Sequence, residues 1–530
     1  MRRARKDSRR KVGFLLGFSI MLAVPTAAQL VDRTTAPNAE GAGIAKSLAD
    51  QIGAGRGDWA TPESSSFIIA RDPFRAIRRG RQLFQRKFTR AQGQGALFGD
   101  GAGDIHKDLA IGAGLADSCA ACHGRPRGSA GVGGDVATRP DSRDAPHLFG
   151  LGLKEMLADE ITADLRAIRR AALADAHHRG RAVRRALRSK GISYGAITAQ
   201  PDGSVDASQV EGVDADLRVR PLFAHGETIS IREFVVGAWN AEMGMQAVDP
   251  ELTLAAAGAR LTTPSGMVLD GSLDKIEAPR AKDATDDPDA DGVIEEIPTS
   301  LVDFMEFYLL NYFKAGTAEQ SARTMGGLNV FEDIGCATCH VPSLTVDRDR
   351  RVADVETVFN PTQGVFNRLF STAAARFVET NDGSGFPSLK QPGLAPFVVR
   401  SIFTDFKRHD LGPAFHERNY DGTVRTQFLT TALWGLGTTA PYGHDGRSVN
   451  LTEVILRHGG EAQAARDRFA QLPPGETRKL LDFLNSLVLF PPDDTASNLD
   501  AGDPSAAGFP QYRHGSIKLT VLFNDPTDAE

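Results

Sequence analysis

The sequence predicts a mainly α-helical protein that contains two similar domains with long loops. Three observations support this prediction. The chain has 530 residues, which exceeds the size that one hydrophobic core usually holds. One short cysteine motif occurs twice, once on each side of the middle of the chain. Apolar residues recur with a helical period in several segments, whereas strand-like runs are few.

The repeated motif is Cys-Ala-Ala-Cys-His at 119–123 and Cys-Ala-Thr-Cys-His at 336–340, and the two copies contain all 4 cysteines of the chain. Each is a C-x-x-C-H, the attachment signature of a c-type haem, in which both thiols bond the porphyrin and the histidine ligates the iron. A zinc site or disulfides are the alternatives, but zinc needs four ligands at tetrahedral spacing and the two cysteine pairs lie far apart in the sequence. The sequence therefore predicts two covalently bound haem c groups in two cytochrome c-like haem domains, held by Cys119, Cys122, His123, Cys336, Cys339 and His340.

Residues 1–28 have the pattern of a secretory signal peptide. A basic segment that ends at Lys11 precedes an apolar run from Val12 to Val24, and small residues lead to a cleavage point after Ala28. The apolar run is too short to span a bilayer comfortably. The net charge of the whole chain is −6, and loss of the basic leader makes the mature protein more acidic, which argues against nucleic-acid binding. We expect a periplasmic protein with no membrane span after cleavage.

Hydrophobic periodicity indicates where the helices lie. An amphipathic helix is expected over 74–88, one or two long helices over 154–190, an apolar helix over 301–313 in the core of the second domain, and a closing helix over 473–487. The expected organisation is a signal peptide (1–28), a poorly structured segment (29–73), an N-terminal haem domain (74–280), an acidic linker (281–300), a C-terminal haem domain (301–490) and a tail (491–530).

The expected linker contains a candidate calcium loop. Asp287, Asp289, Asp291 and Gly292 form D-x-D-x-D-G, which is the first half of an EF-hand loop, where the glycine permits a sharp turn. The twelfth position is Pro298 instead of the bidentate glutamate, so the full motif is absent. The sequence leaves open whether this segment binds Ca²⁺ or is a solvated acidic turn.

Three further stretches resemble a known family. They are Phe223–Ile231 (Phe-Ala-His-Gly-Glu-Thr-Ile-Ser-Ile) followed by Glu-Met-Gly at 242–244, Ala440–Arg447 (Ala-Pro-Tyr-Gly-His-Asp-Gly-Arg), and Leu451–His458. With the two C-x-x-C-H motifs, their order is similar to that of the di-haem oxidoreductase branch of the bacterial di-haem cytochrome c peroxidase superfamily, a branch that includes thiol oxidoreductase-like proteins. The resemblance covers roughly residues 75–490.

The resemblance implies roles for individual residues. His123 and His340 are then the proximal haem ligands. Glu242 occupies the place of the distal glutamate that serves as acid and base in peroxide cleavage. His458 falls where the family has the second axial ligand of the C-terminal haem, a methionine in the peroxidases, and a histidine there should lower the potential.

The chain also departs from the family pattern. No histidine occurs over 124–146, where the peroxidases have a switchable distal ligand, and the family's inter-haem tryptophan falls on Ala224. The family's distal glutamine falls on Phe234. These departures predict an open N-terminal haem in a more apolar pocket. Trp239 or Trp434 could replace the missing aromatic bridge, although either could simply be core.

Two other residues are candidates by their chemistry. His225 could act as a ligand or as an acid/base partner of Glu242, and a structural hydrogen bond is an equal alternative. Arg447 could pair with a haem propionate, because a guanidinium matches carboxylate geometry.

The leading functional hypothesis is a peroxidase-like di-haem oxidoreductase. Electrons would enter from a small donor protein, a cytochrome c or a cupredoxin, and pass through the C-terminal haem to the open N-terminal haem, where hydrogen peroxide or oxygen binds. The alternatives are a di-haem electron carrier without enzymatic activity and an oxygen-dependent oxidation of an organic or protein substrate.

Overall fold

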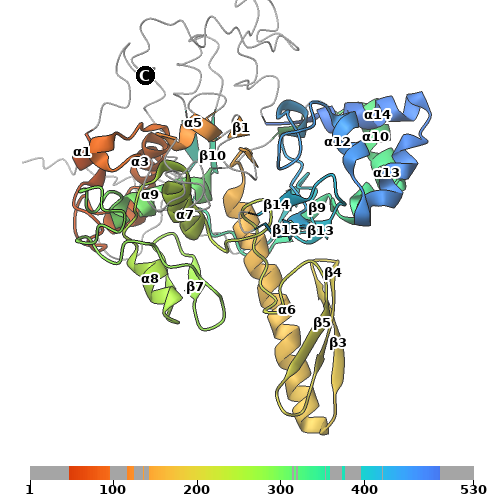
Figure 1. Ribbon diagram of the computed structural model, residues 1–530, viewed down its shortest axis with the longest axis horizontal. Coiled ribbons are helices and arrows are strands. Elements are labelled where there is room, and N and C mark those ends of the chain that lie inside the picture. The colour runs from red at the N-terminus through yellow and green to blue at the C-terminus, as the bar shows by residue number, and fades with distance from the viewer. Residues whose placement is uncertain are drawn as a thin grey trace, which may run out of the picture.

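The computed structural model describes residues 47–95, 116–124, 130, 135–136, 143–312, 316–317, 320–352, 354–357, 373–376, 395–419 and 422–489. The expected signal peptide (1–28) and C-terminal tail (491–530) lie outside the described residues. Figure 1 shows two lobes and a long arm that projects from between them.

The expectation of a mainly α fold with two cytochrome c-like domains is wrong. Of the described residues, 40% are helical and 17% are in strands, and the strands form several small sheets. The other short elements are η2 (Arg90–Gln92), β1 (Asp135–Val136), β2 (Arg143–Asp144), α8 (Pro250–Ala256), β6 (Arg260–Thr262), β7 (Val268–Asp270), β8 (Gly316–Thr317), β10 (Asp354–Thr357), β11 (Ala373–Arg376), η4 (Leu436–Thr438), η5 (Gly460–Ala462) and β17 (Leu487–Val488).

The first lobe is built around one buried helix, α9 (Thr299–Asn311). Around it pack α1 (Leu48–Ile52), α2 (Ser65–Arg71), α3 (Pro73–Gln85) and α7 (Ile231–Met243). Helix α3 confirms the helix predicted over 74–88. We expected the apolar residues that begin at Leu301 in the core of the second domain, but α9 packs in the first lobe with α3 and α7. A helix that is apolar on every side is buried wherever it lies, so its pattern does not identify its neighbours.

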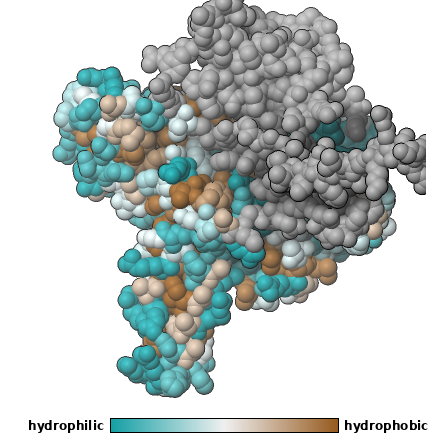
Figure 2. All heavy atoms as spheres, turned by 180° about the vertical axis from the view of Figure 1, so that it is seen from behind, coloured by the Kyte–Doolittle hydropathy of each residue, from teal (hydrophilic) through white to brown (hydrophobic). Residues whose placement is uncertain are grey.

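The arm consists of α6 (Leu151–Arg179) and a three-stranded sheet of β3 (Val183–Ser189), β4 (Ile192–Ala199) and β5 (Val205–Val210). We expected helix as far as 190, but α6 ends at Gly180, which has a φ of 61°. Glycine adopts this left-handed conformation without strain and commonly ends helices. The buried and exposed residues of β3 then alternate as expected for a strand that covers one face of α6. Figure 2, seen from behind, shows mostly hydrophilic residues along this arm.

The second lobe contains α10 (Ala322–Asp333), η3 (Cys336–Thr338), α12 (Leu451–Arg457), α13 (Gln463–Ala470) and α14 (Pro474–Asn485). Helix α14 confirms the closing helix predicted over 473–487. It packs against α10, and the close approach requires Gly327, because a Cβ there would lie 2.1 Å from the Lys479 carbonyl oxygen.

Short strand pairs connect the two lobes. They are β9 (Ser343–Val346) with β12 (Phe397–Arg400), β13 (Arg408–Asp410) with β16 (Gln427–Leu429), and β14 (Glu417–Arg418) with β15 (Val424–Arg425). One hydrophobic cluster includes α6, the arm sheet and residues of the C-terminal half such as Leu344, Ile402 and Trp434. The core therefore does not divide at the middle of the chain. No described helix is both long and apolar enough to cross a membrane.

Candidate functional site: two C-x-x-C-H centres

The first motif forms a short helix, α5 (Cys119–His123). Ser118 caps it by accepting a hydrogen bond from the Ala121 amide at 3.1 Å. The Nδ1–H of His123 donates to the Pro146 carbonyl oxygen at 2.7 Å. This bond fixes the ring and leaves Nε2 available to bind iron. A histidine that ligates a metal usually donates its other ring N–H to a carbonyl or carboxylate in this way.

The second motif orients its histidine in the same way. The chain turns at Gly335, which has a φ of 90°, and continues as η3. The Nδ1–H of His340 donates to the Phe403 carbonyl oxygen at 3.0 Å. Phe331 packs beside this ring and also against Phe403, with 5.6 Å between the centroids of the two phenylalanines. Among the described residues, the Nε2 of neither predicted ligand makes a hydrogen bond.

The cysteines of both motifs are free thiols. Burial raises the pKa of Cys119 to about 12 and the pKa of Cys336 to about 11. A redox-active C-x-x-C dithiol instead has a lowered thiol pKa, so this environment does not favour a dithiol oxidoreductase. Paired thiols beside an oriented histidine fit covalent haem attachment.

The structure brings Glu242 to the first motif. Glu242 lies in the last turn of α7, and its carbonyl oxygen accepts from the Ala116 amide at 3.2 Å. The pKa of Cys122 is raised to about 11. Burial is the largest cause of this shift, and the negative charge of Glu242 is the second largest. Its side chain is therefore close to the first motif, as its predicted role requires.

His458 lies beside the second motif. It follows α12, where its Nδ1–H donates to the Val454 carbonyl oxygen at 2.7 Å, and its ring packs edge-on against Phe415. Burial is the main cause that lowers the pKa of His340 to about 4, and the nearby His458 contributes to this shift. The ring therefore lies near His340, and its Nε2 makes no hydrogen bond with the described residues.

A path of four hydrogen bonds, linked through three pairs of residues that are neighbours in the chain, joins the two predicted ligands. Pro146, which accepts from His123, is followed by His147, whose Nε2–H donates to the Trp434 carbonyl oxygen at 2.7 Å. The preceding Leu433 amide donates to the Ile402 carbonyl oxygen at 3.1 Å. Ile402 is bonded to Phe403, the acceptor for His340. We call this series the inter-motif path.

His147 is the central side chain of the inter-motif path. It is buried, and its Nδ1 makes no hydrogen bond among the described residues. Burial lowers the pKa of His147 to about 3, so the ring is neutral at ordinary pH. Sequence reasoning missed this role, because no local pattern predicts that His147 reaches a carbonyl in the other half of the chain. Trp239 and Trp434 are both buried, and the indole of Trp434 packs against Gly150.

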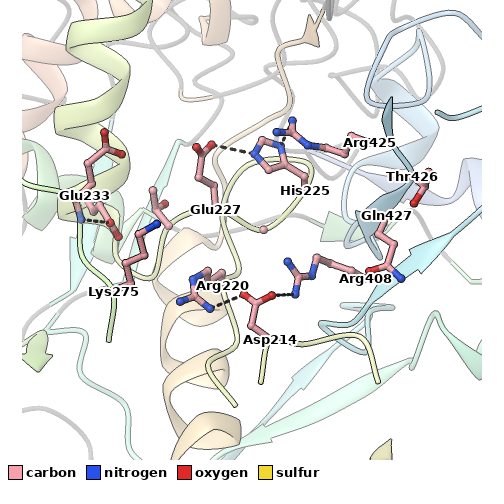
Figure 3. A pocket seen from close by; sticks show the side chains of 13 residues that line it. Asp214, Arg220, His225, Glu227, Glu233, Lys275, Arg408, Arg425, Thr426 and Gln427 are labelled. Atoms are coloured by element: carbon pink, nitrogen blue, oxygen red, sulfur yellow. Dashed lines mark hydrogen bonds and ion pairs between the residues drawn. The ribbon is translucent and has the colours of Figure 1, made fainter. Parts of the chain in front are cut away.

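His225 lies in a different place from Glu242. It lines a pocket at the other end of α7, near Glu233. Glu233 and Glu242 are nine positions apart in this helix, which corresponds to a rise of about 13 Å. Its Nε2–H donates to Glu227 at 3.0 Å, and its Nδ1 accepts from Arg425 at 3.2 Å (Figure 3). His225 is therefore not a partner of Glu242 in this structure.

Arg447 is largely exposed, with 68% of its side chain accessible, and it lies 3.4 Å from Asp445. This position leaves its guanidinium accessible to an anionic group. Asp445 is held mainly by Arg457, at 2.8 Å.

The acidic loop brings together the three predicted calcium ligands. Carboxylate oxygens of Asp287, Asp289 and Asp291 lie within 4.8 Å of one another. Asp289 is buried, and its Oδ2 has no hydrogen-bond partner among the described residues. Gly292 has a φ of 90°, which permits the expected sharp turn. Burial also raises the pKa of the nearby Glu296 to about 8.

Each C-x-x-C-H motif thus has a histidine that is oriented by a main-chain carbonyl, which is the arrangement expected of a c-type haem protein. Residues 349–487 match a family model described as "Di-haem oxidoreductase, putative peroxidase". This match confirms the resemblance to the di-haem oxidoreductase family. It begins after the second C-x-x-C-H motif and contains both the Ala440–Arg447 and Leu451–His458 stretches. The family description supports an oxidoreductase and implies haem cofactors. No curated protein matches the chain.

Proposed function

We propose that this protein is a periplasmic, peroxidase-like oxidoreductase with two covalently attached haem c groups. The haem groups supply redox-active iron at both motifs and, at the first motif, a position where hydrogen peroxide or oxygen can bind. The inter-motif path is the observation that carries the proposal. It connects the predicted ligands His123 and His340 through four hydrogen bonds of 2.7 to 3.1 Å, so the two centres are suited to exchange electrons.

The protein's own residues have distinct parts in this proposal. His123 and His340 ligate iron through Nε2 while their Nδ1–H groups hold the rings in place. His458 would supply a further iron ligand at the second motif, because it lies near His340. Glu242 accepts a proton from peroxide and returns it to the departing oxygen, a role for which a positioned carboxyl is suited.

Electrons come from an external protein in this proposal. A small cytochrome c or a cupredoxin delivers them to the second motif, and they pass along the inter-motif path to the first. The signal-peptide pattern of residues 1–28 supports export, and the acidic net charge argues against nucleic-acid binding. Ca²⁺ binds the Asp287–Asp289–Asp291 loop, because hard cations prefer oxygen ligands.

The first experiment counts covalent haem. The mature protein should retain two haem groups per chain after acid-acetone extraction, and Cys119→Ser and Cys336→Ser should each retain one. A peroxide titration of the intact protein should then oxidise it. Two low-spin centres that bind no small ligand would instead support the electron carrier.

The second experiment tests the inter-motif path. His147→Phe removes the donor to the Trp434 carbonyl and keeps an aromatic ring in place. We expect slower redistribution of an electron between the centres after rapid reduction of one of them. Trp434→Phe is the control, because it changes the indole and keeps the carbonyl. Equal rates in His147→Phe and the wild type would contradict the path.

A further inference from the structure

The pocket that contains His225 has no part in the proposed redox function. Its volume is about 550 Å³, which lies within the range of small-molecule sites. One wall comes from residues 214–233 and 275–277, and the other from β13, β15 and β16. Figure 3 shows Glu233 and Lys275 on one side of the opening, and Arg408, Arg425 and Gln427 on the opposite side.

Most acidic groups of the pocket already have partners. Asp214 pairs with Arg220 at 2.7 Å and also with Arg408. Glu227 accepts from His225 at 3.0 Å. The carboxylate of Glu233 accepts from the Ile229 and Glu277 amides at 2.9 and 3.0 Å. Asp214 and Glu233, which each accept at least two of these bonds, therefore have little remaining capacity to bind a cation.

Several hydrogen-bond donors of the pocket are uncommitted. Lys275 is exposed and makes no ion pair with the described residues. Arg408 uses one nitrogen for Asp214, and Arg425 uses Nη1 for Glu417 and His225, whereas each guanidinium offers five N–H groups. Thr228 is only 5% exposed, and its hydroxyl has no hydrogen-bond partner among the described residues. A buried hydroxyl without a hydrogen-bond partner lowers the stability of the fold, and a ligand that accepts a hydrogen bond from it removes this penalty.

We propose that this pocket binds a small organic carboxylate. The spare N–H groups of Arg408 and Arg425 face one end of the ligand, since a guanidinium matches a carboxylate in shape and charge. Lys275 lies across the opening and binds the other end, and Thr228 donates from the buried wall. The proposal does not depend on haem at either motif.

The position of the pocket connects it to the second motif. Strands β13 and β16 pair Asp410 with Gln427 and His409 with Phe428. Because side chains alternate across a strand pair, Arg408 and Gln427 face the pocket while His409 and Phe428 face away from it. His409 pairs with Asp405 near Cys339, and Phe428 stacks on His444 with 4.0 Å between ring centroids. A single strand pair therefore separates the bound carboxylate from the second motif.

The test uses calorimetric titration of the full-length mature protein with succinate. We expect saturable binding in the millimolar range or tighter, and no binding of succinamide, the uncharged analogue. Lys275→Gln should weaken binding about tenfold, since one charge-assisted hydrogen bond is lost. Lys282→Gln is the matched control, because Lys282 is exposed in the same segment and does not line the pocket.

Thr228→Val distinguishes the contribution of the hydroxyl to ligand binding from its contribution to the stability of the fold. The change removes a hydroxyl that has no partner, so the melting temperature should stay the same or rise while succinate binding weakens several-fold. Absence of succinate binding, or equal binding by the wild type, Lys275→Gln and Thr228→Val, would overturn the proposal. Phosphate that binds as tightly as succinate would show a general anion site and would overturn the carboxylate class.

Discussion

Both motif histidines donate Nδ1–H to a main-chain carbonyl, at 2.7 Å for His123 and 3.0 Å for His340. Neither acceptor belongs to the motif, since Pro146 and Phe403 lie 23 and 63 residues further along the chain. The motif itself predicted which atoms attach haem. The bonds that fix the rings could not be predicted, because they depend on tertiary contacts.

Glu242 and His225 illustrate the same limit. The family resemblance predicted that Glu242 is near the first motif, and its effect on the pKa of Cys122 agrees with that position. His225 is close to Glu242 in sequence, but His225 lies near Glu233 at the start of α7, whereas Glu242 lies in the last turn of the same helix. Proximity along the chain therefore did not indicate proximity at the site.

Glu242→Gln tests the proton transfer. We expect both haem groups to remain and the reaction with peroxide to slow at least about tenfold, because acid/base groups typically contribute about 10²–10⁴-fold. Stopped-flow absorbance with peroxide measures the rate. Glu295→Gln is the control, since Glu295 is exposed; equal rates in the two variants would remove Glu242 from the mechanism.

His458→Ala tests the second axial ligand. If His458 binds iron, its loss should convert one low-spin centre to high spin, which electron paramagnetic resonance detects. His416→Ala is the matched control, because His416 is bound to Asp410 at 2.7 Å and is not near His340 in any described contact. Unchanged spectra for His458→Ala would show that another group occupies this position.

His147 gives a prediction for pH dependence. Its pKa is about 3 in the folded protein and 6.5 in the unfolded chain, so below pH 6.5 the unfolded chain binds the extra proton. Folding stability from this group is therefore present above pH 6.5 and is lost as pH falls toward 3. Between pH 7 and pH 5 the loss is about 2 kcal/mol.

The measurement is denaturant unfolding of the wild type and His147→Gln at both pH values. Glutamine keeps a donor for Trp434 and does not titrate. The variant should lose about 2 kcal/mol less than the wild type over this interval. An identical loss in both proteins would mean that His147 is not held neutral.

At the scale of elements, the sequence predicted the helices whose apolar residues recur with a clear period. Helices α3 and α14 were predicted because their apolar residues repeat with a helical period. Helix α6 was predicted as part of a long helical stretch over 154–190. The arm sheet was missed because its arginines, such as Arg184 and Arg188 on the exposed face of β3, conceal the alternation. The partner of α9 was also missed, because an apolar helix can pack against any lobe.

Two glycines determine how closely other helices approach α9. A Cβ on Gly80 of α3 would lie 2.2 Å from the Phe304 carbonyl oxygen, and a Cβ on Gly152 of α6 would lie 2.1 Å from the Leu310 carbonyl oxygen. Backbone atoms cannot move aside as a flexible side chain can. The first lobe therefore depends on both positions for its packing.

Gly80→Ala should destabilise the protein by about 1–3 kcal/mol, the usual cost of an overpacked contact. Gly237→Ala is the control, because Gly237 lies inside α7 and a Cβ there meets nothing within 4 Å. That change should stabilise by about 0.5–1 kcal/mol, since alanine favours helices. Thermal unfolding of both variants measures the difference, and equal effects would contradict the close packing.

At the scale of the whole molecule, the two halves of the chain share their core. Helix α9 completes the first lobe although it follows the acidic loop, and residues 344–434 contribute to the cluster that holds α6. A division of the chain into two independent haem domains at about residue 300 thus separates residues that pack together.

A fragment of residues 29–300 should therefore not unfold cooperatively, because it lacks α9 and the Trp434 carbonyl that accepts from His147. Circular dichroism during heating measures cooperativity. A fragment of 29–312 restores α9 and should be more helical than the shorter one. A sharp melting transition in the 29–300 fragment would show that the first lobe folds alone.

The acidic loop gives a second prediction for the whole molecule. Ca²⁺ should raise the melting temperature of the wild type, and a chelator should reverse the effect. Asp289→Asn should abolish the response, because Asp289 is the buried ligand. Asp283→Asn is the control, since Asp283 lies in the same segment and its carboxylate accepts a hydrogen bond from the Thr285 hydroxyl at 2.6 Å. A response that survives Asp289→Asn would exclude this loop as the Ca²⁺ site.

The inter-motif path has a consequence for mutational tolerance. All four of its acceptors are main-chain carbonyls, of Pro146, Trp434, Ile402 and Phe403, and every amino acid carries that group. Apart from the two motif histidines, His147 is the one residue that contributes its side chain. Homologous chains can therefore differ at the other path positions and keep the connection. A homologue that lacks the histidine at position 147 is the one expected to have lost electron exchange between its two centres.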